Sequence, residues 1–315
     1  MDWISPRALN RLGMLNMNRR NVAYIARYNE RSSYPLVDNK LKTKLAVAEY
    51  DVKTPKLLQV VKQQHEISRF REMAEGLAGF AIKPAKGAGG KGITVITGRD
   101  GDSFVKASGA RVGASVLERH LTNILAGLYS LAGTPDVAIV EDLVESAPSL
   151  ARYSHQGVPD IRIIVFQGYP VMAMLRLATT DSDGKANLHQ GAVGVGLDLG
   201  TGKSLNAVQF NRPITLHPDT GLPLENIQIE AWDEMLEMAS RCFEATGLGY
   251  MGVDLVVDAQ HGPQLLELNA RPGLAIQMAN GRGLLPRLRA VERLKRPHFT
   301  PGERANYAMK NFASL

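Results

Sequence analysis

Two carboxylates and one amide in the last quarter of the chain have the residue types and spacing of a metal site. Asp254 lies in the segment GVDLVVD, and Glu267 and Asn269 lie in QLLELN, after a short turn. Side chains alternate along a strand, so Glu267 and Asn269 project to one face, and hairpin pairing can bring Asp254 to it. These oxygens suit Mg²⁺, which completes its octahedron with water and substrate phosphates. A solvated hairpin face is the alternative, but the apolar neighbours indicate a buried sheet and favour the metal site.

A glycine-rich segment, FAIKPAKGAGGKGITVI at residues 80–96, has the G-x-G-x-x-G spacing at Gly87, Gly89 and Gly92. A dinucleotide-binding loop needs a helix after the glycines, whereas a strand pattern follows here. A P-loop needs Ser or Thr directly after its lysine, whereas Gly92 follows Lys91. Protein kinases use strand, loop and strand, but the chain has neither H-R-D nor D-F-G. The spacing therefore favours a flexible hairpin whose backbone N–H groups close over phosphates, with a plain turn as the alternative.

Interleaved helix and strand patterns must position these residues. We expect helices at 39–50, 55–75, 114–132, 230–246 and near 284–294, strands at 80–84, 93–97, 137–144, 161–167, 170–179, 252–258 and 264–269, and a long loop at 180–206. Several of the strands follow one another through short connections, as in hairpins. This order predicts an α+β architecture with antiparallel sheet rather than a doubly wound parallel one.

The composition is that of a folded protein of roughly two domains, with 315 residues, 44% hydrophobic and 22% charged. There is no apolar run long enough to span a bilayer and no signal-peptide pattern, so we expect a cytoplasmic enzyme. The single cysteine, Cys242, lies in a helical pattern of apolar residues. We expect it to be a buried packing residue and not a nucleophile.

The net charge of +6 is concentrated at the two ends of the sequence. Residues 1–31 carry six Arg against two acidic residues, and residues 282–315 carry eight Lys or Arg against two, while the 250 residues between are net negative. No aromatic-interleaved or zinc-binding motif accompanies these ends, so the pattern favours solubilising or partner-docking ends over a specific nucleic-acid binder. Attraction to an acidic macromolecule or an anionic membrane surface stays open.

The order of the motifs resembles the ATP-grasp superfamily, in particular its RimK-like α-L-glutamate ligases. The resemblance covers about residues 39–290, through DNKLKTKLAVAEYDVKTP, AIKPAKGAGGKG, AIVEDLVES, PDIRIIVFQGYPVMAMLR, NLHQG and GVDLVVD with LLELNARPGL. The sugar-transfer-associated ATP-grasp proteins are a neighbouring group that the match leaves open.

The resemblance implies an ATP-grasp fold in which two α+β subdomains with mainly antiparallel sheets grip ATP. We expect a basic arm at 1–38, a subdomain with the glycine flap at 39–141, a subdomain with the metal site at 142–290 and a basic tail at 291–315. Family members usually carry an N-terminal α/β domain before the opening lysine, but only 39 residues precede Lys40. The acceptor site would then be completed by the arm, by a partner or second subunit, or be open to a macromolecule.

The resemblance also implies a role for each motif residue. The residues on the nucleotide would be Lys40 and Lys83 at the phosphates, Gly87, Gly89, Gly90 and Gly92 in the flap, Glu141, Asp142, Leu143 and Val144 along the adenine, and Asp160. Two Mg²⁺ ions, replaceable by Mn²⁺, would be held by Asp254, Glu267 and Asn269. The residues around the γ-phosphate and the intermediate would be Arg176, Lys185, Asn187 and Arg271.

The implied chemistry is ATP-dependent ligation of a carboxylate and an amine. A carboxylate attacks the γ-phosphate to give an acylphosphate and ADP, and an amine then forms the amide and releases phosphate. The product would be a peptide, protein or cell-envelope acceptor carrying glutamate or another amino acid. Lys185 and Gln190 stand where the RimK-like pattern has arginines, which puts glutamate specificity in doubt. A phosphotransferase on the same fold is a second hypothesis and a non-catalytic nucleotide-binding scaffold a third, which the intact Asp254, Glu267, Asn269 and Lys83 argue against.

Overall fold

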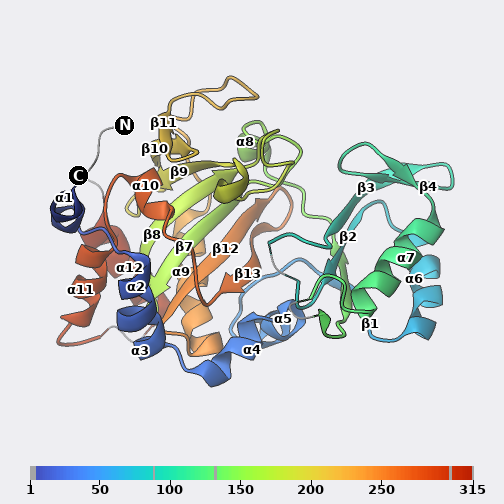
Figure 1. Ribbon diagram of the computed structural model, residues 1–315, viewed down its shortest axis with the longest axis horizontal. Coiled ribbons are helices and arrows are strands. Elements are labelled where there is room, and N and C mark those ends of the chain that lie inside the picture. The colour runs from blue at the N-terminus through green and yellow to red at the C-terminus, as the bar shows by residue number, and fades with distance from the viewer. Residues whose placement is uncertain (1–4, 88, 131–132, 298–299, 314–315) are drawn as a thin grey trace. The chain divides into compact units, whose positions relative to one another are not determined.

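The computed structural model describes residues 5–87, 89–130, 133–297 and 300–313 (Figure 1). The chain divides into two compact units: unit 1 comprises Met1–Val37, Leu45–Lys53 and Ser146–Leu315, and unit 2 comprises Asp38–Lys44 and Thr54–Glu145. The four segments expected from the sequence remain a proposal about how the chain is organised. Within the described residues, no helix is long and apolar enough to cross a membrane.

Unit 2 is built on a six-stranded antiparallel sheet in the order β1-β6-β2-β3-β4-β5. Its elements are β1 (Leu57–Val61), α6 (Ile67–Glu75), β2 (Phe80–Pro84), β3 (Thr94–Asp100), β4 (Ser103–Lys106), β5 (Arg111–Val112), α7 (Ala114–Leu125) and β6 (Ala138–Asp142). Leu117, Leu121 and Ile124 recur at helical spacing and therefore lie on one face of α7, which is buried. They pack with Phe70 of α6 and Phe80 of β2 in one core.

Unit 1 is built on a seven-stranded antiparallel sheet in the order β11-β10-β9-β8-β7-β12-β13. The strands are β7 (Asp160–Phe166), β8 (Tyr169–Leu177), β9 (Val193–Leu197), β10 (Ser204–Gln209), β11 (Arg212–Ile214), β12 (Tyr250–Asp258) and β13 (Gly262–Asn269). The helices are α1 (Pro6–Arg11), α2 (Met17–Arg19), α3 (Ala26–Tyr28), α4 (Tyr34–Val37), α8 (Pro148–Ala151), α9 (Trp232–Thr246), α10 (Ile276–Asn280), α11 (Leu285–Glu292) and α12 (Pro301–Phe312). A further helix, α5 (Lys40–Ala48), has its first half in unit 2 and its second half in unit 1.

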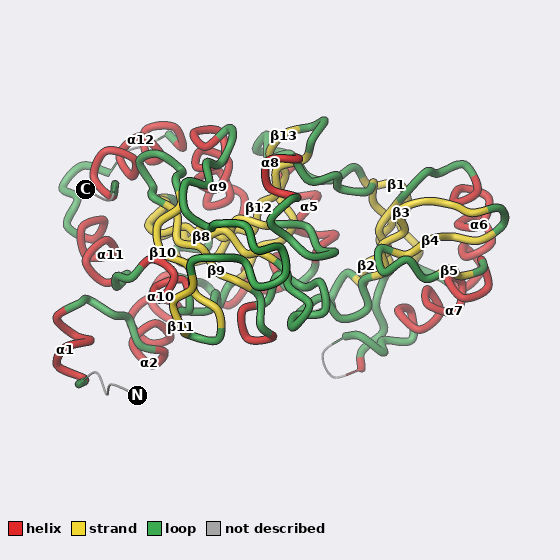
Figure 2. The backbone as a smooth tube through the Cα atoms, turned by 90° about the horizontal axis from the view of Figure 1, so that it is seen from above, coloured by secondary structure: helices red, strands yellow, loops and turns green. Residues whose placement is uncertain are grey.

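The sheet of unit 1 is covered on both faces, and this explains its sequence. Figure 2 shows α9 and α12 on one side of the sheet and α10 on the other. All nine residues of β8 are buried, so the strand is apolar almost throughout instead of alternating. A Cβ added at Gly196 in β9 would lie 2.4 Å from the Ala279 carbonyl oxygen, so α10 packs directly on this strand.

The predicted α+β class with antiparallel sheet is confirmed, but two predicted elements are wrong. Residues 55–75 were expected to be one helix, whereas Leu57–Val61 form β1 and helix α6 begins at Ile67. Val61 is completely buried and pairs with Ala138, so long-range strand pairing outweighs the local helical pattern.

The segment 180–206, expected to be a loop, contains β9 and the start of β10. Strand β9 was not predicted because Gly194 and Gly196 weaken the strand pattern. In the structure these glycines allow close packing against Leu188 and α10. The predicted helix 114–132 ends at Leu125, before Gly127, whose φ is +83°. Helix α12 was not expected, although Thr300 and Glu303 form a capping box that marks its start.

Candidate active site

A row of charged side chains crosses four neighbouring strands of unit 1. The strand register places Arg176 of β8 opposite Asp160 of β7, Arg162 of β7 opposite Asp254 of β12, and Asp254 opposite Glu267 of β13. Residues directly opposite one another in antiparallel strands project to the same face and lie close together. The register therefore assembles alternating acids and bases on one face of the sheet.

The two arginines hold Asp254 from both sides. Arg162 donates from Nε to Oδ1 of Asp254 at 2.7 Å and from Nη2 to Oδ2 at 2.5 Å. Arg176 donates from Nη2 to Oδ2 of Asp254 at 2.9 Å and to Oδ2 of Asp160 at 2.7 Å, and its Nε also bonds Asp160. Asp254 is only 1% exposed, so its negative charge is balanced by guanidinium groups rather than by water.

The three expected metal ligands converge in this row. Nδ2 of Asn269 donates to Oδ2 of Asp254 at 3.1 Å and to Oε1 of Glu267 at 3.4 Å. Among the described residues there is no cluster of three or more His, Cys, Asp or Glu side chains arranged for a metal, so a cation here would need the amide oxygen too. The donor set of two carboxylates and an amide fits Mg²⁺, provided that Asn269 turns its oxygen inward and an arginine releases Asp254.

The electrostatics of the row keep Asp254 ionised. Burial raises its pKa, but the charges of Arg162 and Arg176 outweigh burial and lower the pKa to about 2. Asp160 behaves differently, because burial and the charge of Asp254 outweigh Arg176 and raise its pKa to about 6. The low pKa keeps Asp254 charged at neutral pH, so it can serve as a hard ligand.

A separate basic cluster lies in unit 2. Nζ of Lys83 on β2 contacts Oε2 of Glu141 at 2.6 Å, and Nζ of Lys44 on α5 contacts Oε1 of the same carboxylate at 2.9 Å. Burial raises the pKa of Glu141, but the two lysines hold it below its usual value. Burial lowers the pKa of Lys44, and Glu141 offsets this only in part. Glu141, expected along the adenine, is therefore the shared counter-ion of two lysines.

Lys44 was not singled out in the sequence, but a signal was present. It lies four residues after Lys40 on the same helix, and residues at that spacing share a helix face. Lys40 itself lies at the base of the glycine loop: its Nζ donates to the Gly87 carbonyl at 2.7 Å, and its backbone N–H donates to the Ala85 carbonyl at 2.8 Å.

The glycine loop connects β2 to β3 as the sequence predicts. Gly89, Gly90 and Gly92 have φ values of +63°, +75° and +74°, which side-chain-bearing residues rarely adopt. Gly87 has no such φ, but a Cβ there would lie 2.3 Å from Cγ of Pro84. Ala88, between Gly87 and Gly89, lies outside the described residues.

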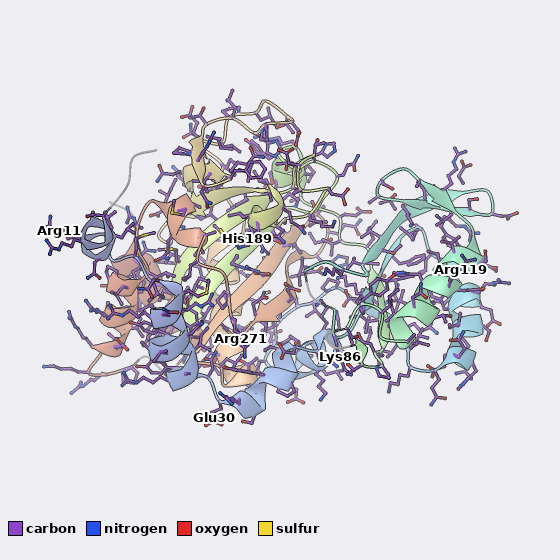
Figure 3. All side chains as sticks on the ribbon, viewed as in Figure 1. Arg11, Glu30, Lys86, Arg119, His189 and Arg271 are labelled. Carbon is purple, nitrogen blue, oxygen red and sulfur yellow. The ribbon has the colours of Figure 1, made fainter. Side chains whose placement is uncertain are left out.

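The other predicted site residues have local partners of their own. Lys185 pairs with Asp183 at 2.9 Å, and Oδ1 of Asn187 accepts from the backbone N–H of His189 at 3.1 Å. Arg271 is exposed on the loop after β13, with its guanidinium 5.3 Å from the ring centre of Tyr34 (Figure 3). Of the four residues expected around the γ-phosphate, the structure places Arg176 in the charged row and the other three on loops.

The other residues expected along the adenine, which begin with the last residue of β6, make backbone and packing contacts. The backbone N–H of Asp142 donates to the Lys56 carbonyl at 2.9 Å, and Leu143 covers Gly79, where a Cβ would lie 2.8 Å from Cδ2 of the leucine. Val144 follows and is half-buried.

Arg162 was not predicted as a site residue, although its motif DIRIIV was noted, because only the register with β12 reveals its partner.

Several solved structures are similar to this chain at low identity. The ATP-grasp ligase PsnB complexed with minimal precursor shares 17% identity over 84% of this chain and 62% of that one, with a TM-score of 0.43. The D-cycloserine synthetase DcsG shares 17% over 83% and 72%, with a TM-score of 0.48. D-alanyl-alanine synthetase A from Vibrio cholerae shares 12% over 89% and 66%, with a TM-score of 0.48. The chain thus spans about three fifths of the length of PsnB.

Membership of a family rests on a sequence match. None of the curated proteins matches the chain. The family model described as sugar-transfer associated ATP-grasp matches residues 19–293, which is most of the chain, and this is the branch that the motifs left open beside the RimK-like ligases. The chain therefore belongs to the sugar-transfer-associated ATP-grasp family.

Proposed function

We propose that this protein is an ATP- and Mg²⁺-dependent ligase that joins a carboxylate to an amine through an acylphosphate. The observation that carries the proposal is the convergence of Asp254, Glu267 and Asn269 on one face of the β12–β13 hairpin. Membership of the ATP-grasp family supports the use of ATP. The substrates that we propose are an amino acid, with glutamate as one candidate, and a peptide, protein or envelope acceptor in the cytoplasm.

Asp254, Glu267 and Asn269 would hold the metal. Bound there, Mg²⁺ would supply positive charge to the phosphate oxygens during transfer. Oδ2 of Asp254 accepts from both arginines and from Asn269, so coordination requires at least one of these donors to leave. Arg176 has a second partner in Asp160, whereas both donor groups of Arg162 that contact the row go to Asp254.

We propose that the guanidinium that leaves Asp254, whether it belongs to Arg162 or to Arg176, becomes a phosphate ligand. An arginine presents a planar fork that matches phosphate oxygens, and it stays charged at any pH at which the enzyme works. The same side chain would thus neutralise Asp254 when metal is absent and stabilise charge on the transferring oxygens when ATP is present. In unit 2, Lys83 and Lys40 would neutralise nucleotide phosphates, and the Gly87–Gly92 loop would donate backbone N–H groups.

The proposed reaction then needs no protein nucleophile. A substrate carboxylate displaces ADP from the γ-phosphorus, the amine attacks the acyl carbon, and phosphate leaves as the amide forms. Positioning and electrostatic stabilisation account for such a transfer. The buried Cys242 has no part in it.

The test is incubation with ATP, Mg²⁺, an amino-acid pool and a candidate acceptor, with free phosphate and acceptor mass followed together. We expect one phosphate released for each amino-acid residue gained, and an acyl hydroxamate when hydroxylamine replaces the amine. The Glu267→Gln variant should slow both by at least about a hundredfold. An acceptor that gains the mass of a phosphate, with none released, would instead identify a phosphotransferase.

A further inference from the structure

The two basic ends of the sequence meet on one surface of unit 1. The Leu12 and Gly13 carbonyls accept from the backbone N–H groups of Gly283 and Leu285, each at 3.1 Å. Gln277 of α10 accepts from the Leu15 N–H at 2.8 Å and returns a bond to the Leu15 carbonyl at 3.0 Å. The N-terminal segment is therefore fixed against α10 and α11.

Close packing makes this junction specific. Gly13 has a φ of +70°, and a Cβ there would lie 2.5 Å from Cδ of Pro286 at the start of α11. A Cβ at Gly283 would lie 1.9 Å from the Gly13 carbonyl oxygen. Only glycines let the two backbones approach this closely, so the junction is a built part of the fold.

The elements that this junction joins carry exposed positive charge from both ends. The exposed basic residues, which we call the terminal basic surface, are Arg7, Arg11, Arg289, Arg293, Lys295 and Arg296. Figure 3 shows Arg11 on α1 pointing away from the rest of unit 1. The acidic residue among them, Glu292, is engaged by the Tyr28 hydroxyl at 2.9 Å. The rest of the sequence between the ends is net negative, so the excess positive charge belongs to the two ends.

Large aliphatic side chains are exposed on the same N-terminal segment. Leu12, Met17 and Val22 are 52%, 64% and 72% exposed, and Leu9 is 37% exposed. Burying these side chains in water-excluded surroundings would be favourable, yet the fold leaves them at the surface. Arginines beside exposed aliphatic residues are also found on protein segments that lie in a bilayer interface.

We propose that the terminal basic surface docks this protein on an anionic lipid bilayer, with the protein lying on the membrane and not crossing it. Arginines near an anionic leaflet are attracted to its headgroups, and aliphatic side chains enter the headgroup boundary. A single-stranded nucleic acid would instead favour exposed aromatic rings for stacking, and the exposed large apolar side chains of α1 and α2 are aliphatic.

The test is flotation of the full chain with lipid vesicles. We expect binding to vesicles of about three parts phosphatidylcholine to one part phosphatidylglycerol and little binding to phosphatidylcholine alone. The variant carrying Arg11→Glu and Arg293→Glu, one change from each end, should bind the anionic vesicles at least about tenfold more weakly. The matched control carries Arg69→Glu and Arg119→Glu, exposed residues of unit 2 with the same change of net charge, and should keep most of the binding.

A third variant separates insertion from simple charge attraction. With Met17→Ser and Val22→Ser, we expect binding at low salt to fall by about twofold and the binding left at high salt to disappear, because salt screens the arginines only. The proposal is overturned by equal binding to neutral vesicles, by equal loss in the control variant, or by no vesicle binding. It is also overturned if light scattering shows a dimer that the Met17→Ser and Val22→Ser changes dissociate, since the surface would then join two copies of the chain.

Discussion

Each unit contains a buried carboxylate whose charge is compensated by two cations, namely Glu141 in unit 2 and Asp254 in unit 1. Each carboxylate is nearly inaccessible and is shared by two cations, Lys44 and Lys83 in one case and Arg162 and Arg176 in the other. A buried charge that loses its partner is costly, whereas a complete pair is close to neutral in stability. Each cluster is therefore complete as it stands, and removing one of its partners should be costly.

The Glu141→Gln variant should be strongly destabilised. The change keeps the side-chain shape but removes the negative charge, leaving Lys44 and Lys83, whose side chains are only 11% and 14% exposed, without a counter-ion. We expect the free energy of unfolding to fall by about 3 kcal/mol in urea titrations. The matched control is Glu118→Gln, which breaks the more exposed pair with Arg71 and should cost less than about 1 kcal/mol. Equal effects of the two changes would contradict this account of Glu141.

Cys242 should be unreactive in the folded protein. The thiol is completely buried, and burial raises its pKa, so little thiolate forms at neutral pH. A thiol reagent such as Ellman's reagent should modify it only after unfolding in denaturant. Rapid modification of the native protein would show that the helix α9 opens readily and that the residue is more than a packing group.

Among the helices and strands, the sequence predicted which side chains share a face of a strand and in which order the elements follow one another. The hairpin of β12 and β13 brings Asp254, Glu267 and Asn269 together because a two-residue period fixes the face of each side chain. The period cannot reveal which strand lies beside the hairpin, so Arg162 became visible only from the register of β7 with β12. The strand β1 was missed for the same reason, since its pairing with β6 is distant in sequence.

The Gly196→Ala change should test the packing of α10 on β9. A Cβ at this position would lie 2.4 Å from the Ala279 carbonyl oxygen, so the helix or the strand must move. We expect a loss of about 1 to 3 kcal/mol in unfolding free energy. The control is Gly98→Ala in β3, where a Cβ would meet nothing within 4 Å and should leave stability almost unchanged. If thermal unfolding ranks the two variants in the opposite order, the packing has been misjudged.

The turn after β11 should make stability depend on pH through His217. This buried ring accepts from the N–H groups of Asp219 and Thr220 at Nδ1, both at 3.3 Å, so its Nε2–H faces the Ala178 carbonyl. Burial lowers the pKa of His217, and Asp219 and Ala178 offset this only in part. The unfolded chain then binds the proton more tightly, so the contribution is present above about pH 6.5 and is lost as the pH falls through the lower folded pKa.

The measurement for His217 is unfolding free energy between pH 8 and pH 5, compared with the His217→Asn variant, which retains an acceptor near Nδ1 but does not titrate. Wild type should lose more stability than the variant on acidification. Parallel pH profiles would assign the dependence to other groups.

For the whole molecule, the family assignment and the charge distribution support two separate proposals. The match over residues 19–293 covers both the glycine loop and the charged row, and the motif order made this membership predictable. The meeting of the two basic ends was not predictable, because it depends on backbone and Gln277 side-chain contacts between residues 12–15 and 277–286. We expect removal of Mg²⁺ by a chelator to abolish ligation but to leave vesicle binding unchanged, since the terminal basic surface has no part in the metal site. Joint loss in flotation and phosphate-release assays would contradict this separation.

Binding of ATP with Mg²⁺ is tested most directly by thermal unfolding with and without the two ligands, in wild type and in Glu267→Gln. At a ligand concentration about a hundredfold above its dissociation constant, binding to the folded state adds about 2.7 kcal/mol, so ATP with Mg²⁺ should raise Tm by several degrees. ATP with chelator should raise it less, and Glu267→Gln should lose the metal-dependent part. An unchanged Tm in wild type at about millimolar ATP and Mg²⁺ would show that the protein does not bind this ligand pair and would overturn the proposed function.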